Sequence, residues 1–124
     1  MILGVGIDIA DVRRWTKLMA RRPAILERIF TAAEREACLS QSAPERSFAA
    51  RFAAKEACLK ALGTGWGQGL GFLHVEVSGG RGTQPSLRLH GPAAERFAGM
   101  GGKALHLSLT HEGDTAAAVV ILEK

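Results

Sequence analysis

The sequence lacks the features that mark several structural classes. It contains no tyrosine, two tryptophans and five phenylalanines in 124 residues. No apolar run approaches the roughly 20 residues of a membrane-spanning helix, and the first residues lead into a strand pattern without a basic leader. Heptads, internal repeats and low-complexity tails are also missing. These absences argue against coiled-coil, repeat and membrane proteins, and we expect a cytoplasmic protein.

Cysteine is scarce as well. Cys38 and Cys58 both lie among small and apolar residues in helical patterns, so we expect reduced thiols in a core rather than a disulfide. A chain of 124 residues is predicted to form one domain over 1–124, without needing a disulfide or a metal to fold. The net charge of +4 indicates an anionic ligand or an acidic partner.

Hydrophobic periodicity predicts both helices and strands. Strands are expected over 2–9, 72–77, 85–89, 104–111 and 115–122, the last apolar enough to be central. Helices are expected over 12–22, from Pro23 through Phe30, from Thr31 to about Gln41, from Ser42 to Gly63, and from Gly91 through Phe97. Thr31–Glu34 and Ser42–Glu45 both have capping-box spacing.

The first strand has two unlike faces. Leu3, Val5, Ile7 and Ile9 point one way, and Gly4, Gly6 and Asp8 point the other. Two glycines beside a carboxylate form a surface that another group can approach closely. Asp11 is better placed than Asp8 to cap the next helix.

The longest predicted helix carries an acid and a base one turn apart. Glu56 lies at the edge of an apolar stripe that includes Phe52 and Leu59, and Lys60 follows at i+4. The pattern alone favours an ordinary surface ion pair, which contributes little to stability.

Other polar patterns are ambiguous when taken singly. His106, Ser108 and Thr110 share one face of a predicted strand, where they are either phosphate ligands or ordinary half-exposed residues. The glycine-rich segment 63–71 has neither Walker nor Rossmann spacing. The basic stripe on the first helix is either solvated or a docking surface for an acidic partner.

Five motifs occur in the same order as in one known family. They are Gly6-Ile-Asp8, Phe30-Thr31-x-x-Glu34, Arg51-Phe-Ala-Ala-Lys-Glu-Ala57 with Lys60, Gly63-Thr-Gly65 and Ser108-Leu-Thr-His111. Together they resemble the holo-acyl-carrier-protein synthases, the small bacterial type of 4′-phosphopantetheinyl transferase. The resemblance covers essentially the whole chain. The run from Arg51 to Ala57 is its most specific part, and residues 79–84 are the least family-like.

This resemblance implies an α+β fold in which helices wrap an antiparallel sheet. It also implies transfer of 4′-phosphopantetheine from coenzyme A to a serine of apo-acyl carrier protein, releasing 3′,5′-ADP. The implied metal is Mg²⁺, held by Asp8 and Glu56, which suits a cation that prefers oxygen ligands. Lys60 would neutralise a phosphate oxygen. Glu56 would take the serine proton either directly or through a metal-bound water, and both routes stay open.

The resemblance also implies partners and contacts. The coenzyme A contacts carry over to Arg51, Lys60, Gly63, Gly65, His106, Ser108 and His111. The first-helix residues Arg13, Arg14, Lys17 and Arg21 become the expected docking surface for the acidic carrier protein. A homotrimer with active sites between subunits, acting in fatty acid biosynthesis, is implied as well.

Two other functional classes compete with this interpretation. A small nucleic-acid-binding module would explain the positive charge, but no RNP, KH or zinc-finger pattern is present. A non-catalytic subunit that binds acyl carrier protein would explain the basic helix. It would leave Asp8 and Glu56 without a purpose.

Overall fold

The computed structural model describes residues 1–63, 69–80 and 82–124. Two antiparallel sheets are present, one of three strands in the order β1-β5-β4 and one formed by β2 and β3. The strands are β1 (Ile2–Asp11), β2 (Val75–Gly80), β3 (Thr83–Leu89), β4 (Ala104–Glu112) and β5 (Thr115–Glu123). The helices are α1 (Val12–Arg21), α2 (Ile25–Ile29), α3 (Ala32–Leu39), α4 (Pro44–Ala61) and α5 (Gly91–Gly99), with a 3₁₀ turn η1 at Phe72–His74.

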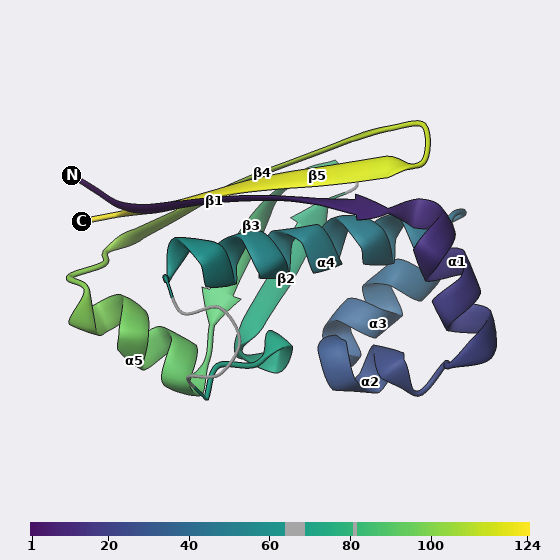
Figure 1. Cartoon of the computed structure of the whole chain (residues 1–124), viewed down its shortest axis with the longest axis horizontal. Helices are drawn as coiled ribbons and strands as arrows, with labels where there is room; N and C mark the ends of the chain where they lie inside the picture. The colour runs from purple at the N-terminus through teal and green to yellow at the C-terminus, as the bar shows by residue number, and fades with distance from the viewer. Residues whose placement is uncertain (64–68, 81) are drawn as a thin grey trace.

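The three-stranded sheet packs on α4. Figure 1 shows α4 running along one face of the sheet, and none of the described helices covers the other face. The strand β5 lies between β1 and β4, as the sequence predicts. Its residues alternate in burial, and Ala116, Ala118, Val120 and Leu122 form the buried row.

Glycines in β1 let α4 approach the sheet closely. A Cβ atom at Gly6 would lie 1.8 Å from the carbonyl oxygen of Ala57, and one at Gly4 would lie 2.1 Å from that of Ala61. Both distances are far shorter than a non-bonded contact allows. The close approach predicted for this face is therefore confirmed, and the approaching group is the backbone of α4.

The helix-start predictions have mixed outcomes. The Asp11 side chain caps α1 by accepting the N–H of Arg13 at 2.9 Å, and Thr31 and Glu34 form the predicted capping box of α3. The predicted Ser42–Glu45 capping box is wrong, because α4 begins at Pro44 and its N-cap, Ala43, makes no side-chain cap bond.

One strand prediction is wrong in its first half. Phe72–His74 forms a 3₁₀ turn, and β2 begins only at Val75. The N–H of Gly71 donates to Nδ1 of His74 at 2.8 Å, and the N–H of His74 donates to the Gly71 carbonyl at 3.1 Å. These two bonds close a turn that an extended chain cannot make.

Aromatic side chains join the helices on the covered side. The ring centroids of Phe30 and Phe48 lie 4.9 Å apart, and Trp15 contacts Phe30 at 5.5 Å and Phe52 at 5.1 Å. Cys38 and Cys58 are buried and unpaired with each other, which confirms the prediction of core thiols. This packing fixes α1 and α4 against each other beside β1.

Candidate active site

Lys60 links α4 to the first strand. Its Nζ lies 2.9 Å from Oδ1 of Asp8 and 3.0 Å from the carbonyl oxygen of Ile7. The Asp8 side chain is only 17% exposed, whereas that of Lys60 is 52% exposed. The i+4 pattern favours Glu56 as the partner of Lys60, but the ion pair that forms crosses to β1.

Glu56 belongs to the same electrostatic environment. Burial raises the pKa of the half-buried Glu56 carboxyl, and the negative charge of Asp8 raises it further. The positive charges of Lys60 and Arg14 oppose the rise in pKa. The fold therefore brings Asp8, Glu56 and Lys60 close enough to interact, and it places Arg14 of α1 near them. A carboxyl with a raised pKa is suited to accept a proton near neutral pH.

The two carboxylates fit a magnesium ion by their chemistry. In the described part of the chain, no group of three or more His, Cys, Asp or Glu side chains is arranged to hold a metal. Mg²⁺ typically uses one or two carboxylates and completes its octahedron with water and phosphate oxygens. The mutual repulsion that helps raise the pKa of Glu56 is what a bound cation would relieve.

A cavity of about 310 Å³ lies between the start of α4, the β2–β3 hairpin and the end of β4. Arg46, Arg51 and His111 give it a basic lining, and Val77 and Gly79 contribute a wall. A basic concave surface of this size can hold a phosphorylated ligand.

Arg51 is held in place by the protein itself. It is only 8% exposed, its Nη1 donates to the Val77 carbonyl, and its Nη2 donates to the Gly79 carbonyl at 3.1 Å. The guanidinium therefore forms a fixed positive wall of the cavity rather than a mobile side chain.

The cavity and the carboxylates lie on different sides of α4. Arg51 and Glu56 are five residues apart, which corresponds to a rotation of about 140° around the helix axis. Arg51 contacts β2, whereas Glu56 faces Asp8 and Lys60 near β1. One chain therefore does not gather all the predicted site residues into one place.

His106 and Ser108 lie on the opposite face of the sheet from Asp8. The β4 register places them opposite Ile121 and Val119, on the sheet face that α4 does not cover. Nε2 of His106 lies 2.9 Å from Oε1 of Glu123, and His106 holds the pKa of the Glu123 carboxyl below its usual value. His111, in contrast, lines the cavity.

Gly63 follows the end of α4 with a positive φ of 74°. The preceding Leu62 carbonyl accepts a hydrogen bond from Nε of Arg96 at 3.0 Å. Gly65, the other predicted loop residue, lies outside the described residues.

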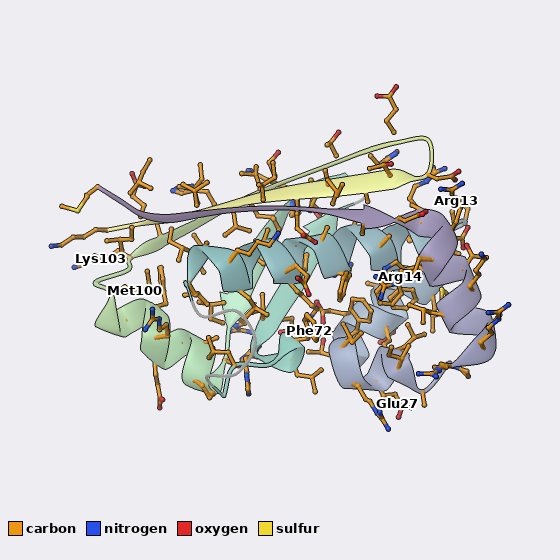
Figure 2. All side chains as sticks on the ribbon, in the orientation of Figure 1. Arg13, Arg14, Glu27, Phe72, Met100 and Lys103 are labelled. Atoms are coloured by element: carbon orange, nitrogen blue, oxygen red, sulfur yellow. The ribbon has the colours of Figure 1, made fainter. Side chains whose placement is uncertain are left out.

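The basic residues of α1 are all exposed. Arg13 is partly neutralised, because its Nη2 lies 3.3 Å from Oδ2 of Asp11 and its Nε lies 3.8 Å from Oδ2 of Asp114. Arg13, Arg14 and Lys17 line a shallow depression at this end of the molecule, where Figure 2 labels Arg13 and Arg14. Arg21 lies in the last turn of α1.

Some residues of the site could not be recognised from the sequence. Arg46 lines the cavity, yet it belongs to none of the motifs. Glu34 and Lys55 both belong to the motifs, but the motifs do not reveal that the two side chains form a completely buried ion pair. The i+4 spacing of Arg51 and Lys55 places both on one side of α4, but it does not show which segment they contact.

None of the described helices combines the length and apolar character needed to cross a membrane. A sequence model of the 4′-phosphopantetheinyl transferase superfamily matches residues 4–120. The chain is 42% identical to the holo-[acyl-carrier-protein] synthase of Geotalea daltonii, with 100% of both chains covered. It is 47% identical to that of Methylorubrum populi, covering 99% of this chain and 94% of the relative.

Solved structures of the same kind share the fold. The holo-[acyl-carrier-protein] synthase of Neisseria meningitidis aligns with a TM-score of 0.88 at 33% identity, covering 100% of both chains. The Helicobacter pylori synthase in complex with coenzyme A aligns with a TM-score of 0.82 at 32% identity, covering 96% of this chain and 99% of the other. The expected α+β fold, with helices against antiparallel strands, is therefore confirmed.

Proposed function

This chain belongs to the 4′-phosphopantetheinyl transferase superfamily, and we propose that it is a holo-acyl-carrier-protein synthase. It transfers 4′-phosphopantetheine from coenzyme A to a serine of apo-acyl carrier protein. The serine oxygen bonds to the phosphorus that carries pantetheine, the bond from that phosphorus to the bridging oxygen breaks, and 3′,5′-ADP leaves. The observation that carries the proposal is the carboxylate pair of Asp8 and Glu56 beside Lys60.

Glu56 is proposed to accept the serine proton. Its raised pKa makes it a stronger base than an ordinary glutamate, which favours proton transfer near neutral pH. The transfer is either direct or through a water molecule. Lys60 supplies positive charge for a phosphate oxygen, because phosphoryl transfer depends mainly on positioning and charge neutralisation.

Asp8 and Glu56 are the residues that would hold Mg²⁺. When bound, the ion polarises the phosphoryl group and stabilises the charge on the leaving oxygens. The salt bridge of Lys60 to Asp8 keeps this carboxylate of β1 oriented toward α4. Lys60 contacts Oδ1 of Asp8. The second oxygen of that carboxylate, Oδ2, would then be the one that holds the metal ion.

The basic cavity is proposed to bind coenzyme A. Arg51 and His111, both expected to contact coenzyme A, line it together with Arg46. The positive charges of the two arginines suit the phosphates of the ligand, and the imidazole of His111 offers a further hydrogen-bonding group. Gly63, which follows α4, and Gly65 are proposed as further contacts.

We also propose that the chain works as a homotrimer. Val5, Ile7 and Ile9 of β1 are 57%, 65% and 69% exposed, and β5 extends this apolar face with Ile121 opposite Val5 and Val119 opposite Ile7. A contiguous apolar face of this kind favours association. Within one chain, the carboxylates of Asp8 and Glu56 lie apart from the cavity and from His106 and Ser108. In the trimer, a neighbouring copy would bring its cavity, or its His106 and Ser108, next to these carboxylates.

The basic surface of α1 and the two buried thiols bear on the partner and the compartment. Arg13, Arg14, Lys17 and Arg21 are proposed to dock the acidic carrier protein, since their charges are exposed on one helix. Two buried free thiols are compatible with a reducing cytoplasm, where the enzyme would serve fatty acid biosynthesis.

Mass spectrometry of apo carrier protein incubated with coenzyme A, Mg²⁺ and the protein tests this function. We expect the carrier to gain the mass of one phosphopantetheine, and Asp8→Asn or Glu56→Gln to abolish most of the gain. Glu36→Gln, which changes an exposed glutamate of α3, serves as the matched control. A folded wild-type protein that binds the carrier without changing its mass would be a non-catalytic binding subunit instead.

A further inference from the structure

Glu34 and Lys55 form an ion pair that the proposed reaction does not use. Nζ of Lys55 lies 2.7 Å from Oε1 of Glu34, and both side chains are completely buried. A buried ion pair is a poor device for stability alone, because the cost of removing both charges from water cancels much of their attraction. The surroundings of the pair indicate another purpose.

The hydrogen bonds of the pair reach backbone groups on other segments. Lys55 also donates to the carbonyl oxygens of Phe72, at 3.0 Å, and Val75, which uses all three of its N–H donors. Glu34 accepts the N–H of Thr31 and, through Oε2, the N–H of Val77, each at 2.8 Å. Burial lowers the pKa of the Lys55 ammonium, and the Glu34 carboxylate opposes that shift.

These contacts take the place of a neighbouring strand along β2. Among the described residues, β2 pairs only with β3, and α4 lies beside its other edge (Figure 1). Val77 is held at both of its backbone groups there: Glu34 accepts its N–H and Arg51 donates to its carbonyl. Val77, Gly79 and Arg51 all line the basic cavity, so the side chains that hold this edge also set the shape of the cavity wall.

We infer that Glu34 and Lys55 are positioning residues for the coenzyme A cavity. Glu34 accepts the N–H of Val77, and Lys55 holds the Glu34 carboxylate in place. The position of Val77 in turn fixes the guanidinium of Arg51, which donates to the Val77 carbonyl at the cavity wall. Neither Glu34 nor Lys55 is among the residues that line the cavity, so both act through their neighbours. The inference rests on the proposed function, because it takes the cavity as the coenzyme A site.

Three variants test the inference. Glu34→Gln keeps the shape of the side chain and removes its charge. Lys55→Met leaves the Glu34 charge buried without a partner and is expected to unfold most readily. The double variant Glu34→Gln/Lys55→Met removes both charges and is expected to be more stable than Lys55→Met alone. Glu36→Gln is the matched control, since it makes the same chemical change at an exposed position of α3.

Calorimetry with coenzyme A, steady-state kinetics and amide hydrogen exchange provide the measurements. We expect Glu34→Gln and the double variant to bind coenzyme A about tenfold more weakly, because a small displacement of a binding wall has a large effect on a rigid site. The KM for carrier protein should stay at the wild-type value. The Val77 amide should exchange faster in both variants than in wild type, and Glu36→Gln should match wild type in every measurement.

Several results would overturn the inference. Folded variants that bind coenzyme A as tightly as wild type would reduce the pair to a structural contact, even if their Tm is lower. Unfolding of every variant would make the pair a requirement for folding only, which also overturns the positioning role. A wild-type protein that binds no coenzyme A would refute the proposed function itself, and that result is seen before any variant is measured.

Discussion

Glu56 carries a charge that its surroundings disfavour. Burial is the largest cause of its raised pKa, the negative charge of Asp8 adds to it, and the positive charges of Lys60 and Arg14 offset only part of the effect. A group whose ionised form is destabilised in the folded state lowers stability wherever it is ionised. Such a cost is typical of a functional site, where activity rather than stability selects the residue.

Replacing Glu56 by glutamine should therefore make the folded protein more stable near neutral pH. Below the usual glutamate pKa of 4.5 the carboxyl is protonated in both the folded and unfolded states, so the variant gains nothing there. As the pH rises above 4.5 toward the raised pKa of the folded state, wild type binds more protons folded than unfolded. Its stability therefore falls relative to the variant.

Thermal unfolding at pH values from about 4 to 8 measures this difference, with Glu36→Gln as the exposed control. We expect the Tm advantage of Glu56→Gln to be absent at the acidic end and largest at the neutral end. Added Mg²⁺ should raise the Tm of wild type more than that of the variant. A variant that is less stable than wild type at neutral pH would contradict the electrostatic account.

The identities of the site residues could be predicted more easily than their contacts. The motifs pointed to Asp8, Glu56 and Lys60, and the structure brings these three together. The ion pair of Lys60 with Asp8 could not be predicted, because it depends on the distance between α4 and β1. The contacts of Arg51 with the Val77 and Gly79 carbonyls depend in the same way on where β2 packs.

At the scale of elements, the contact between β1 and α4 decides where Asp8 stands. Gly6 lies against the Ala57 carbonyl of α4. Ala57 is next to Glu56 in the sequence, and Gly6 is two residues before Asp8. The glycines of this strand predicted that something approaches closely. The strand pattern could not say that the partner is the helix that carries Glu56, because long-range packing is not encoded in local periodicity.

Gly6→Ala should destabilise the protein by about 3 kcal/mol or more, at the upper end of the range for overpacked cores. The added Cβ meets backbone at 1.8 Å, and backbone cannot move aside as a flexible side chain does. Gly99→Ala is the control, because its Cβ meets no atom within 4 Å. Chemical denaturation measures both variants, and a loss below about 1 kcal/mol at Gly6 would mean that α4 shifts freely.

Two segments with the same capping-box pattern behave differently. In Thr31–Glu34 the acid is the third residue of α3, so its side chain reaches back to the N–H of Thr31 at 2.8 Å. In Ser42–Glu45 the helix begins later, at Pro44, which makes Glu45 the second residue of α4. The pattern predicts a helix start, but the position of the start depends on how the preceding turn packs.

The basic surface of α1 contains residues of two kinds. Arg14 is close enough to Glu56 for its charge to lower the pKa of that carboxyl, so it affects more than docking. Lys17, one turn later, is exposed and has no such coupling to Glu56. Charge reversal at Lys17 is therefore the clean test of docking.

Lys17→Glu should raise the KM for carrier protein at low salt and leave the KM for coenzyme A unchanged. The effect should shrink with added salt, since the Debye length falls from about 10 Å at 0.1 M to about 3 Å at 1 M. Arg14→Glu should in addition move the acidic limb of the pH–rate profile upward. Lys103→Glu, at the opposite end of the molecule (Figure 2), is the control. If Lys17→Glu has unaltered kinetics at low salt, the basic surface of α1 is a solvent-exposed face that does not bind the carrier protein.

At the scale of the whole molecule, the sheet buries the less apolar face of its first strand. The Gly4, Gly6 and Asp8 row packs on α4, while Val5 and Ile7 remain exposed. Alternation predicted two faces but not which one would be covered. Hydrophobicity alone would have selected the wrong face, because the apolar row is the one that stays exposed in the single chain.

Val5→Glu should prevent the proposed assembly, because the new charge would be buried between copies without a partner. Sedimentation velocity should show a trimer for wild type and a monomer for the variant. Leu39→Glu places the same charge on α3 at another exposed apolar residue, 57% exposed like Val5, and should remain a trimer. A wild-type protein that sediments as a monomer would refute the assembly.

If neighbouring copies complete each active site, two inactive variants should restore each other. Glu56→Gln removes the proposed base, and His111→Ala alters the cavity on the other side of α4. In a random mixture of trimers, about a quarter of the subunit interfaces combine an intact Glu56 with an intact His111 from the neighbouring copy. Co-refolding the two variants at equal amounts should therefore recover about a quarter of wild-type transfer, measured by the mass gain of the carrier protein. A mixture no more active than the sum of its separate components would mean that each chain uses its own Glu56 and His111.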